Sequence, residues 1–591
     1  MDRTGRIVVI LCMLVMGALL YFYPSSLFQP PAPAHAGTST AATSAITNSA
    51  TSTPPSLTSA TANSPTTAQA VNSTLAQVPA APVAEQLTLL ENDSVRVTFT
   101  SHGAAIKEVE LKKHKEGNNG NVVLNGQSHE NVMTLTGWPG ADSTVFQVKE
   151  VPPNDVVYSG DLPGGIKWER SYTLGKDYSL DVKDSLTNTG AADVTLPAYS
   201  LTVGRAEPLL VAGHYQPISN MYLGAGWLAN KFHLTTVNDF NPGFVPLVGI
   251  KTREGKDLFS SRVVDDAPLK WLGMENQFFT MLLTPAREIS IQHAEFRCFN
   301  ERDENGSVPY GIEPDIEASA FFPEVKVAAG QTTVLNYGLY AGPKDYDRLN
   351  ALGDEQGQLM NYGLFVVLIV PMLWVLHFFH SYVGSYGVAI MLLTLIIKGC
   401  TWPLQSIANH SGKRMQALAP KLKELQAKYK DQPEKITTET FAMYREYGVS
   451  PFGGCLPALV QMPVFFSLYF MLQNAVELRG QSFLWVHDLT QPDTVLTLPF
   501  VLFGHHLGLN PLPIIVTGLM AIMMRMTPQI GDPQQAKIAQ FMPLIFLFIF
   551  YNFAAALSLY YVINNCVSII QIYRNLRKPL PELKRVPKKK T

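Results

Sequence analysis

Apolar residues gather in long runs at the two ends of the chain, and the region between them shows short alternation instead. The first run, Ile7 to Tyr23, follows Arg3 and Arg6, which is typical of a signal peptide or a signal anchor. Ala34-His35-Ala36 has the small-x-small form of a cleavage site but lies far beyond the run. We therefore favour an uncleaved transmembrane anchor at residues 1–23, with its basic end in the cytoplasm and the following residues exported.

The next two regions differ in composition. Residues 24–84 are almost wholly Ala, Ser, Thr, Pro, Gln and Asn, so they predict a disordered tether that cannot bury an apolar core. From 85 to 343 apolar and polar residues alternate, as at Val95, Val97 and Phe99, which indicates half-buried strands. A region of this length with many short strands predicts an exported all-β sandwich domain.

The C-terminal part carries several runs that approach the ~20 apolar residues needed to cross a bilayer. We expect a membrane core at residues 386–573, with spans at about 386–406, 454–474, 512–526, 538–553 and 557–573. Residues 361–380 are also apolar. The predicted fold class is a multi-domain membrane protein with an α-helical core of five spans, an N-terminal signal anchor and a large exported β domain.

Basic residues indicate which loops stay in the cytoplasm. Segment 410–447 and the tail 574–591 are both rich in lysine and arginine, whereas loop 475–510 carries few charges. One crossing at 386–406 places segment 410–447 inside, and four more crossings return the tail to the cytoplasm. A crossing at 361–380 would place both basic segments outside, so we predict that these residues form an interfacial helix on the outer surface.

Segment 410–447 has the periodicity of two short helices. The apolar residues of the first recur at spacings of three and four: Met415, Leu418, Leu422, Leu425 and Tyr429. Asp431-Gln432-Pro433 interrupts the pattern before a second helix. Together with basic residues such as Lys413 and Arg414, this pattern predicts a cytoplasmic helical hairpin. An ordinary charged loop is the alternative.

One charge lies inside a predicted span. Lys398 interrupts the apolar run that begins at Tyr386, and a charge at the centre of a span costs roughly 2.5–3.5 kcal/mol on insertion scales. Such a residue usually faces a bundle interior or a watery cavity, although a lysine can also extend its ammonium to the headgroups. Polar residues of other spans either share one wet cavity with it or simply bond between helices. They are Gln461, Tyr560, Tyr561, Asn564 and Asn565.

Motifs for covalent or metal chemistry are missing from the sequence. The five cysteines form no CxxC pair, no Walker or G-x-S-x-G motif occurs, and His129-Glu130 lacks the second histidine of a zinc helix. We therefore expect no enzyme activity, no cofactor and no metal. One alternative is an ion-coupled transporter, which would need paired carboxylates that the spans lack. The other is a membrane-anchored periplasmic carbohydrate-active enzyme, which would need an acid–base pair in the β domain.

Six motifs in the C-terminal part resemble, in their order, those of the YidC/Oxa/Alb family of membrane-protein insertases. They are Lys398-Gly399-x-x-x-Pro403-Leu404, Pro451-Phe452-Gly453-Gly454-Cys455-Leu456-Pro457, Gln461-Met462-Pro463-Val464-Phe465, Phe483-Leu484-Trp485-Val486-His487-Asp488-Leu489, Phe541-Met542-Pro543 and Leu559-Tyr560-Tyr561. The resemblance is close over about 361–578. The anchor, tether and exported β domain match the Gram-negative form of the family in layout.

The resemblance implies a five-helix core in the bacterial inner membrane, with a hydrophilic groove open to the cytoplasm and to lipid. The family's groove cation falls on Lys398, where the bacterial form more often carries arginine. Thr394, Gln461, Tyr560 and Tyr561 match other groove or substrate-contact positions. The cytoplasmic hairpin is then the element that receives substrates, and its apolar stripe would capture hydrophobic nascent segments.

The resemblance also implies partners. The protein would insert and help fold nascent membrane proteins in the lipid bilayer, alone or with the Sec translocon. The basic tail would contact the translating ribosome by charge and read no specific nucleic acid sequence. Such a tail serves equally well as a topology signal or a contact with anionic lipid.

Overall fold

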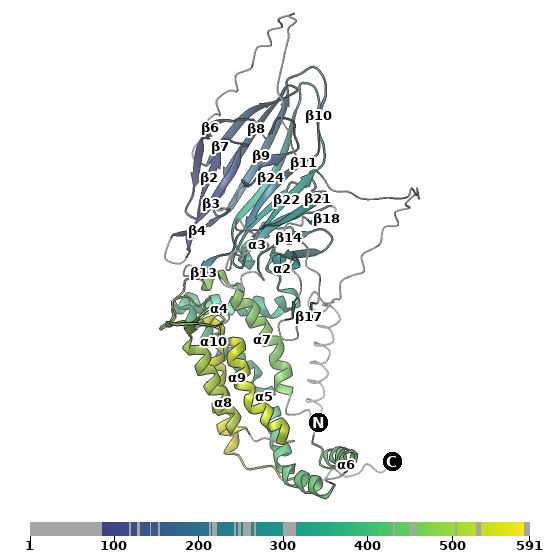
Figure 1. Cartoon of the computed structure of the whole chain (residues 1–591), viewed down its shortest axis with the longest axis vertical. Coiled ribbons are helices and arrows are strands. Elements are labelled where there is room, and N and C mark those ends of the chain that lie inside the picture. The colour runs from purple at the N-terminus through teal and green to yellow at the C-terminus, as the bar shows by residue number, and fades with distance from the viewer. Residues whose placement is uncertain are drawn as a thin grey trace, which may run out of the picture.

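The computed structural model consists of a β domain above a bundle of helices (Figure 1). The predicted anchor at 1–23, the tether at 24–84 and tail residues 584–591 lie outside the described residues. The structure describes residues 85–583 except for 117–119, 127–129, 142–143, 152–153, 212–213, 216–221, 241–243, 246–249, 252–261, 265–267, 300–314, 430–431, 450–455, 503–504 and 528–532.

Strands make up most of the β domain. In chain order they are β1 (Leu87–Glu91), β2 (Val95–Thr100), β3 (Ala105–Lys115), β4 (Asn121–Leu124), β5 (Leu135–Thr136), β6 (Gln147–Val151), β7 (Asp155–Leu162), β8 (Ile166–Leu174), β9 (Ser179–Asn188), β10 (Val194–Leu196), β11 (Tyr199–Ala206), β12 (Leu210–Val211), β13 (His214–Tyr215), β14 (Gly224–Leu228), β15 (Phe232–Thr236), β16 (Phe244–Val245), β17 (Ile250–Lys251), β18 (Arg262–Val264), β19 (Trp271–Glu275), β20 (Phe279–Pro285), β21 (His293–Phe299), β22 (Asp315–Phe322), β23 (Val325–Val327) and β24 (Thr332–Pro343). A one-turn helix, α2 (Val237–Phe240), follows β15.

Two large antiparallel sheets pack on each other around one apolar core. In the described residues, one has nine strands in the order β15-β14-β19-β20-β24-β9-β8-β7-β6, and the other has five in the order β18-β21-β22-β11-β5. Strands β1 to β4 form a further sheet. Val95, Val97 and Phe99 of β2 point inward as the alternation predicts, while Arg96 between them is exposed. The predicted β-sandwich is therefore confirmed.

The core of the β domain contains a paired charge. The Arg170 guanidinium on β8 and the Asp184 carboxylate on β9 have no exposed side-chain surface, and Nε and Oδ1 lie 2.7 Å apart. A second bond joins Nη2 to Oδ2 at 2.9 Å, and the Trp168 indole N–H also donates to Oδ1. Arg170 Nη1 donates to the carbonyl of Met133 at 2.7 Å. Each charge is therefore hydrogen-bonded, which a buried ion pair needs if it is not to destabilise the fold.

The helical part begins after β24. Its elements are α3 (Tyr346–Leu352), η3 (Gln356–Met360), η4 (Gly363–Phe365), α4 (Val366–Val383), α5 (Tyr386–Lys428), α6 (Pro433–Glu446), α7 (Leu456–Asn474), η6 (Val476–Leu478), β25 (Leu496–Leu502), β26 (His505–Leu509), α8 (Pro511–Met526), α9 (Pro533–Phe550) and α10 (Ala555–Leu576). Among the described residues, three helical segments are long and apolar enough to cross a membrane: Gly363–Val383, Tyr386–Pro403 and Ala555–Leu576. The shorter helix α8 is also apolar.

Helix α5 joins two elements that the sequence predicts separately. It runs for 43 residues from the first predicted core span into the hairpin, through Pro403 and Pro420. A proline removes one backbone hydrogen bond and bends a helix, but here neither proline ends it. Near the upper end of α5, a Cβ at Gly387 would lie 2.2 Å from the Phe483 ring of loop 475–510. Only glycine therefore allows this loop to pack against the start of the helix.

The same loop caps the upper ends of two further helices. The Asp493 carboxylate accepts a hydrogen bond from the backbone N–H of Leu512, in the first turn of α8, at 2.6 Å. The backbone N–H of Ala555, the first residue of α10, donates to the carbonyl of Gln491 at 2.7 Å. These bonds satisfy N–H groups that a helix start leaves free, and they fix α8 and α10 relative to α5. The sequence analysis did not predict the hairpin β25–β26 in this loop.

Helix α4 lies beside the upper end of the bundle, next to the β domain (Figure 1). Just before its first residue, the Phe365 ring lies 5.6 Å from the ring of Phe470, in the last turns of α7. Near its other end, His377 Nε2 lies 3.5 Å from the carboxylate of Glu477, beyond α7. The start of α4 thus lies beside the last turn of α7, and its second half contacts the short helix η6 that follows α7. This helix has the length and apolarity of a span, so its interfacial position stays a prediction.

The β domain touches the bundle through the turn between β19 and β20. The Gln277 side chain donates a hydrogen bond to the carbonyl of Gln473, in the last turn of α7, at 2.7 Å. The Arg479 guanidinium lies over the rings of Phe278 and Phe279, at 5.8 and 5.3 Å from their centroids. A cation over an aromatic face in a partly desolvated site is stabilising. The β domain therefore rests on the upper end of α7.

Candidate intramembrane groove

Lys398 lies between α5 and α10, which pack on each other. Its ammonium donates to the Ser568 hydroxyl at 2.9 Å, and only 7% of the residue is exposed. At 1.5 Å per residue, Lys398 lies about 18 Å along α5 from Tyr386, close to the middle of a bilayer core of ~30 Å. Among the described residues, no carboxylate lies within ion-pair distance of this ammonium. The structure thus places an unpaired charge inside the helical region.

The structure brings some predicted groove residues together. The Ser568 hydroxyl donates to the backbone carbonyl of Asn564 at 2.8 Å, so the main chain of Asn564, rather than its amide side chain, is linked to the Lys398–Ser568 pair. About two turns before Ser568, on the same face of α10, the Tyr560 hydroxyl accepts a hydrogen bond from the Gln461 amide of α7 at 2.9 Å. No hydrogen bond between described residues joins these two groups.

Two other predicted groove residues, Thr394 and Tyr561, make contacts of a different kind. Thr394 is fully buried, and its hydroxyl donates to the carbonyl of Ile390 on the same helix at 2.7 Å. The Tyr561 ring lies in an aromatic cluster, 5.9 Å from the ring of Phe465 and 5.1 Å from that of Phe550. Thr394 therefore presents its methyl group and lone pairs, and Tyr561 contributes mainly apolar surface.

Sequence reasoning missed further polar groups on α10. Ser568 was not among the predicted residues, yet it holds the Lys398 ammonium. The hydroxyl of Ser558 and the side-chain N–H groups of Asn565 are buried with no hydrogen-bond partner among the described residues. Asn565 is one of the polar span residues found from the sequence. Ser558 and Ser568 lie at helical spacing from it in the same apolar run, which is the signal that could have found the two serines. An unsatisfied buried group costs about 1–3 kcal/mol, so a polar ligand or water would be stabilised here.

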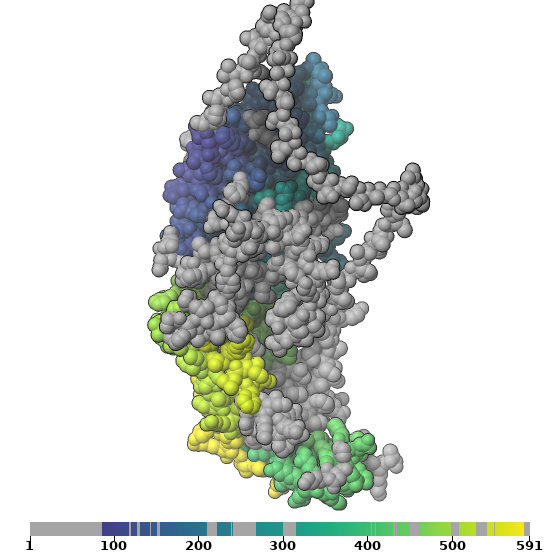
Figure 2. Space-filling model, viewed as in Figure 1, coloured from purple at the N-terminus to yellow at the C-terminus, as the bar shows by residue number. Residues whose placement is uncertain are grey.

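The hairpin lies at the end of the bundle farthest from the β domain (Figure 1, Figure 2). Leu418 and Leu422 are buried and Leu425 is half-buried, so the predicted capture stripe is not free. A small core of Leu418, Tyr447 and Val449 packs against further apolar residues of both hairpin helices and the tail: Met415, Met443, Tyr444 and Leu583. Close packing of the two helices explains this burial, because each has its own apolar face. The exposed large apolar side chain of the hairpin is Phe441.

The two basic residues predicted for the hairpin hold it in place. The Lys413 ammonium donates to the carbonyl of Lys578, just beyond α10, at 2.6 Å. The Arg414 guanidinium donates to the carbonyl of Tyr447, at the end of α6, at 2.9 Å. Both contacts satisfy carbonyls that a helix end leaves free. Lys413 and Arg414 therefore connect the hairpin to the tail and close it, rather than forming a free basic face.

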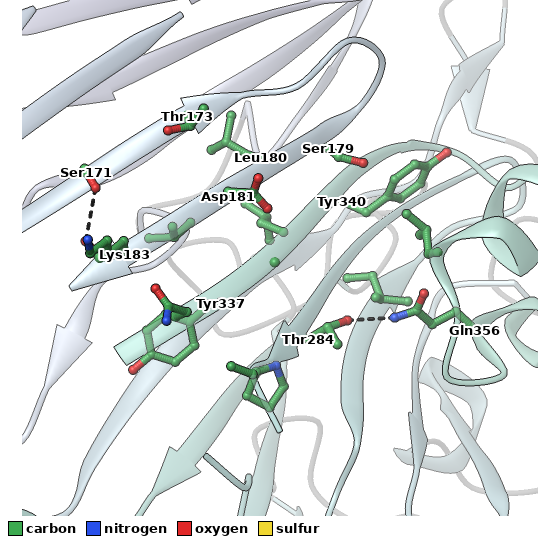
Figure 3. Close-up of a pocket in the computed structure, with 18 residues that line it drawn as sticks. Ser171, Thr173, Ser179, Leu180, Asp181, Lys183, Thr284, Tyr337, Tyr340 and Gln356 are labelled. Atoms are coloured by element: carbon green, nitrogen blue, oxygen red, sulfur yellow. Dashed lines mark hydrogen bonds between the residues drawn. The ribbon is translucent and has the colours of Figure 1, made fainter. Parts of the chain in front are cut away.

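A separate hollow of about 550 Å³ lies on the β domain, over strands β8, β9, β20 and β24 (Figure 3). Asp181 and Lys183 line it from β9, and the Gln356 amide donates to the Thr284 hydroxyl at its edge, at 2.8 Å. Asp181 is the one carboxylate among the described lining residues. The hollow thus lacks the pair of carboxylates that most carbohydrate-cleaving enzymes use. In the described ranges, no three His, Cys, Asp or Glu side chains gather as metal ligands would.

Comparison with known proteins accounts for both parts of the chain. The family described as 60Kd inner membrane protein matches residues 378–579, and the YidC periplasmic domain family matches residues 88–375. The membrane protein insertase YidC of Pelobacter propionicus is 31% identical over 520 residues, which cover 84% of this chain and 88% of that protein. That of Geobacter sulfurreducens is 31% identical over 497 residues, covering 81% and 83%.

A solved structure, titled an active YidC insertase crystal structure with the first transmembrane domain resolved, is also similar. The match covers 84% of this chain and 94% of the chain in that structure, with 16% sequence identity and a TM-score of 0.35.

The fold and the matching families define an inner-membrane protein that carries a large periplasmic β domain on a helical membrane region. The sequence identity and coverage of the relatives identify the family: the chain belongs to the YidC family of membrane-protein insertases. It inserts nascent membrane proteins into the lipid bilayer, and the relatives are named for that function rather than for an enzyme activity. The predicted family, the insertase function and the fold class of a helical membrane region with a large periplasmic β domain are therefore confirmed, while the number of spans stays a prediction. The motif at 451–455 lies outside the described residues.

Proposed function

We propose that the helical core forms a hydrophilic groove, open to the cytoplasm and to lipid, in which Lys398 attracts acidic residues of the segment being translocated. The observation that carries this proposal is the buried ammonium with a hydroxyl, and no carboxylate, beside it in the described residues. An ammonium has three donors, so two remain for a substrate. The other proposed groove residues are Thr394, Gln461, Tyr560, Tyr561 and Asn564.

The hydrophobic segment of the substrate would leave the groove along α7 and α9. Both helices expose large apolar side chains: Met462 and Phe466 on α7, and Phe541, Leu544 and Phe548 on α9. Helix α8 has 16 residues and α9 has 18, and spans of this length tend to thin the bilayer locally. Burial of the substrate's apolar segment, together with the membrane potential, would supply the energy.

The experiment compares Lys398→Arg, Lys398→Ala and Lys398→Glu with two substrates that differ only in whether the translocated tail is acidic or neutral. At an effective dielectric near 20, a charge pair at ~4 Å is worth on the order of 4 kcal/mol before desolvation, and a third of that is tenfold in rate. We expect arginine to be tolerated, and alanine and glutamate to slow the acidic substrate tenfold or more. The neutral substrate should be nearly unaffected. Equal insertion rates for all variants on the acidic substrate would exclude the groove charge.

We further propose that the hairpin of α5 and α6 receives substrates through its exposed face around Phe441, since its inner stripe is packed. Deletion of residues 413–445 should abolish insertion while the protein remains in the membrane. The ribosome would bind the basic tail by charge, and the protein would insert substrates alone or with the Sec translocon. If ribosomes bind in a salt-sensitive way and this binding is lost when residues 579–591 are removed, the contact between the ribosome and the tail is supported. Binding that persists without these residues would exclude that contact.

For topology, we propose that both termini are cytoplasmic, that α5, α7, α8, α9 and α10 cross the membrane, and that α4 lies at the periplasmic surface. The positions of α4 and of the hairpin support this order. Impermeant thiol reagents added from outside should label cysteine at Thr490 and not at Gln426. Labelling at Gln426 would make α4 a span.

A further inference from the structure

Ser568 lies one helix away from Lys398 and is its hydrogen-bond partner. A serine hydroxyl has one proton to donate and two lone pairs to accept with. The proton is used on the carbonyl of Asn564, at 2.8 Å on the same helix. The lone pairs are therefore turned toward Lys398, whose ammonium donates to them at 2.9 Å.

This geometry matters because a lysine has a long and flexible side chain. Without a partner at mid-membrane, the ammonium would extend toward the headgroups at the cytoplasmic side, as lysines in spans commonly do. The hydroxyl of Ser568 provides a neutral acceptor at the depth of Lys398. A carboxylate at the same place would pair with the ammonium, so that the charge would no longer be available to a substrate.

We propose that Ser568 is a positioning residue that holds the Lys398 ammonium at the groove, and that it thereby sets the preference for substrates with acidic tails. Because the hydroxyl satisfies one of three donors, it keeps the ammonium in place and leaves it able to bind a substrate carboxylate. This inference rests on the proposed function of Lys398.

The test uses a matched pair of variants in the full-length protein, Ser568→Thr and Ser568→Val. Threonine and valine have nearly the same shape and differ by the hydroxyl, so packing is held constant while the acceptor is removed. Insertion rates are measured for the matched acidic-tail and neutral-tail substrates, normalised to the amount of folded protein. We expect threonine to stay within about twofold of the native rate for both substrates. Valine should slow the acidic substrate roughly three- to tenfold, as the loss of one hydrogen bond predicts, and spare the neutral one.

Two combinations separate positioning from a structural role. In a Lys398→Ala background, Ser568→Val should cause no further loss, because the residue acts only through the ammonium. Ser568→Asp should reduce acidic-tail insertion to the level of Lys398→Ala, since an aspartate would pair with the lysine. Equal slowing of both substrates by valine, or effects of Lys398→Ala and Ser568→Val that multiply, would overturn the proposal.

The failures of the two proposals can be told apart. If Lys398→Ala leaves the acidic substrate unaffected, the groove charge itself is refuted. If Lys398→Ala slows that substrate while Ser568→Val does not, the groove charge stands and only the positioning role of Ser568 is excluded.

Discussion

The two halves of the molecule each bury a cation, and they treat it in opposite ways. In the β domain, Arg170 is bonded to both oxygens of Asp184 and to a backbone carbonyl. In the helical core, Lys398 has one neutral hydroxyl beside it in the described residues. A guanidinium has a rigid fork that suits permanent pairing, whereas an ammonium on a flexible stem can accept a new partner. The first cation is committed to the fold, and we propose that the second remains available to a substrate.

The largest effect should follow from breaking the β-domain pair. Asp184→Ala leaves the Arg170 guanidinium buried without its carboxylate, which costs about 3–5 kcal/mol in comparable pairs. We expect strands β8 and β9 to lose amide-exchange protection by that amount, while the helical core keeps its protection. Insertion at low temperature should continue. A loss below about 1 kcal/mol would mean that carbonyls alone can hold Arg170, and the contrast between the two cations would weaken.

The next effect should be an increase in stability rather than a loss. Lys398→Met removes a charge whose presence at the centre of a span costs roughly 2.5–3.5 kcal/mol on insertion scales. The helical core should therefore be as stable as the native core or more so, while insertion of acidic-tail substrates falls. Unfolding in mixed detergent micelles, followed by the protection of α5 and α10, measures this stability. A less stable core would show that Lys398 is structural, as Arg170 is.

The smallest effect concerns a group at the boundary between the two halves. His114 on β3 packs edge-on against Phe279, and burial together with the nearby Arg479, Arg348 and Lys113 lowers its pKa to about 4. The unfolded chain takes up a proton near pH 6.5, whereas the folded chain does so only near 4. The β domain should therefore lose stability as the pH falls from 6.5 to 4.

The control for this pH dependence is His114→Gln. The variant removes the titrating ring, so it should flatten the dependence of unfolding on pH within that window. An unchanged slope in the variant would assign the acid sensitivity to other groups.

Local patterns predicted the elements well, and pairings between elements poorly. Alternation at Val95, Val97 and Phe99 identified β2, and apolar length identified α7, α8 and α10 close to their observed ends. The start of α9 was placed several residues late, since its first turn is polar. The first core span and the first helix of the hairpin were predicted as separate elements. They form one continuous helix, α5, which contains Pro403 and does not end there.

The candidate site shows the same limit. Lys398 could be found from the sequence because it is a charge inside an apolar run. Gln461 and Asn564 could be found because they are polar residues inside such runs. Ser568 was not visible, since serine is common in spans and its role depends on an α5–α10 contact that joins residues 170 positions apart. The burial of Leu418 was missed for the same reason, because the cluster in which it packs includes residues of α6, the turn after it and the chain end.

The continuity of α5 has a mechanical consequence. At 1.5 Å per residue, the helix extends about 63 Å from Tyr386 to Lys428, and Lys398 lies about 18 Å from its upper end. That end is held where the Phe483 ring covers Gly387. If the helix swings as a stiff rod about this point, a displacement of its lower end is reduced about 3.5-fold at Lys398. Bending at Pro403 or Pro420 would reduce it further, so the ammonium would move much less than the hairpin.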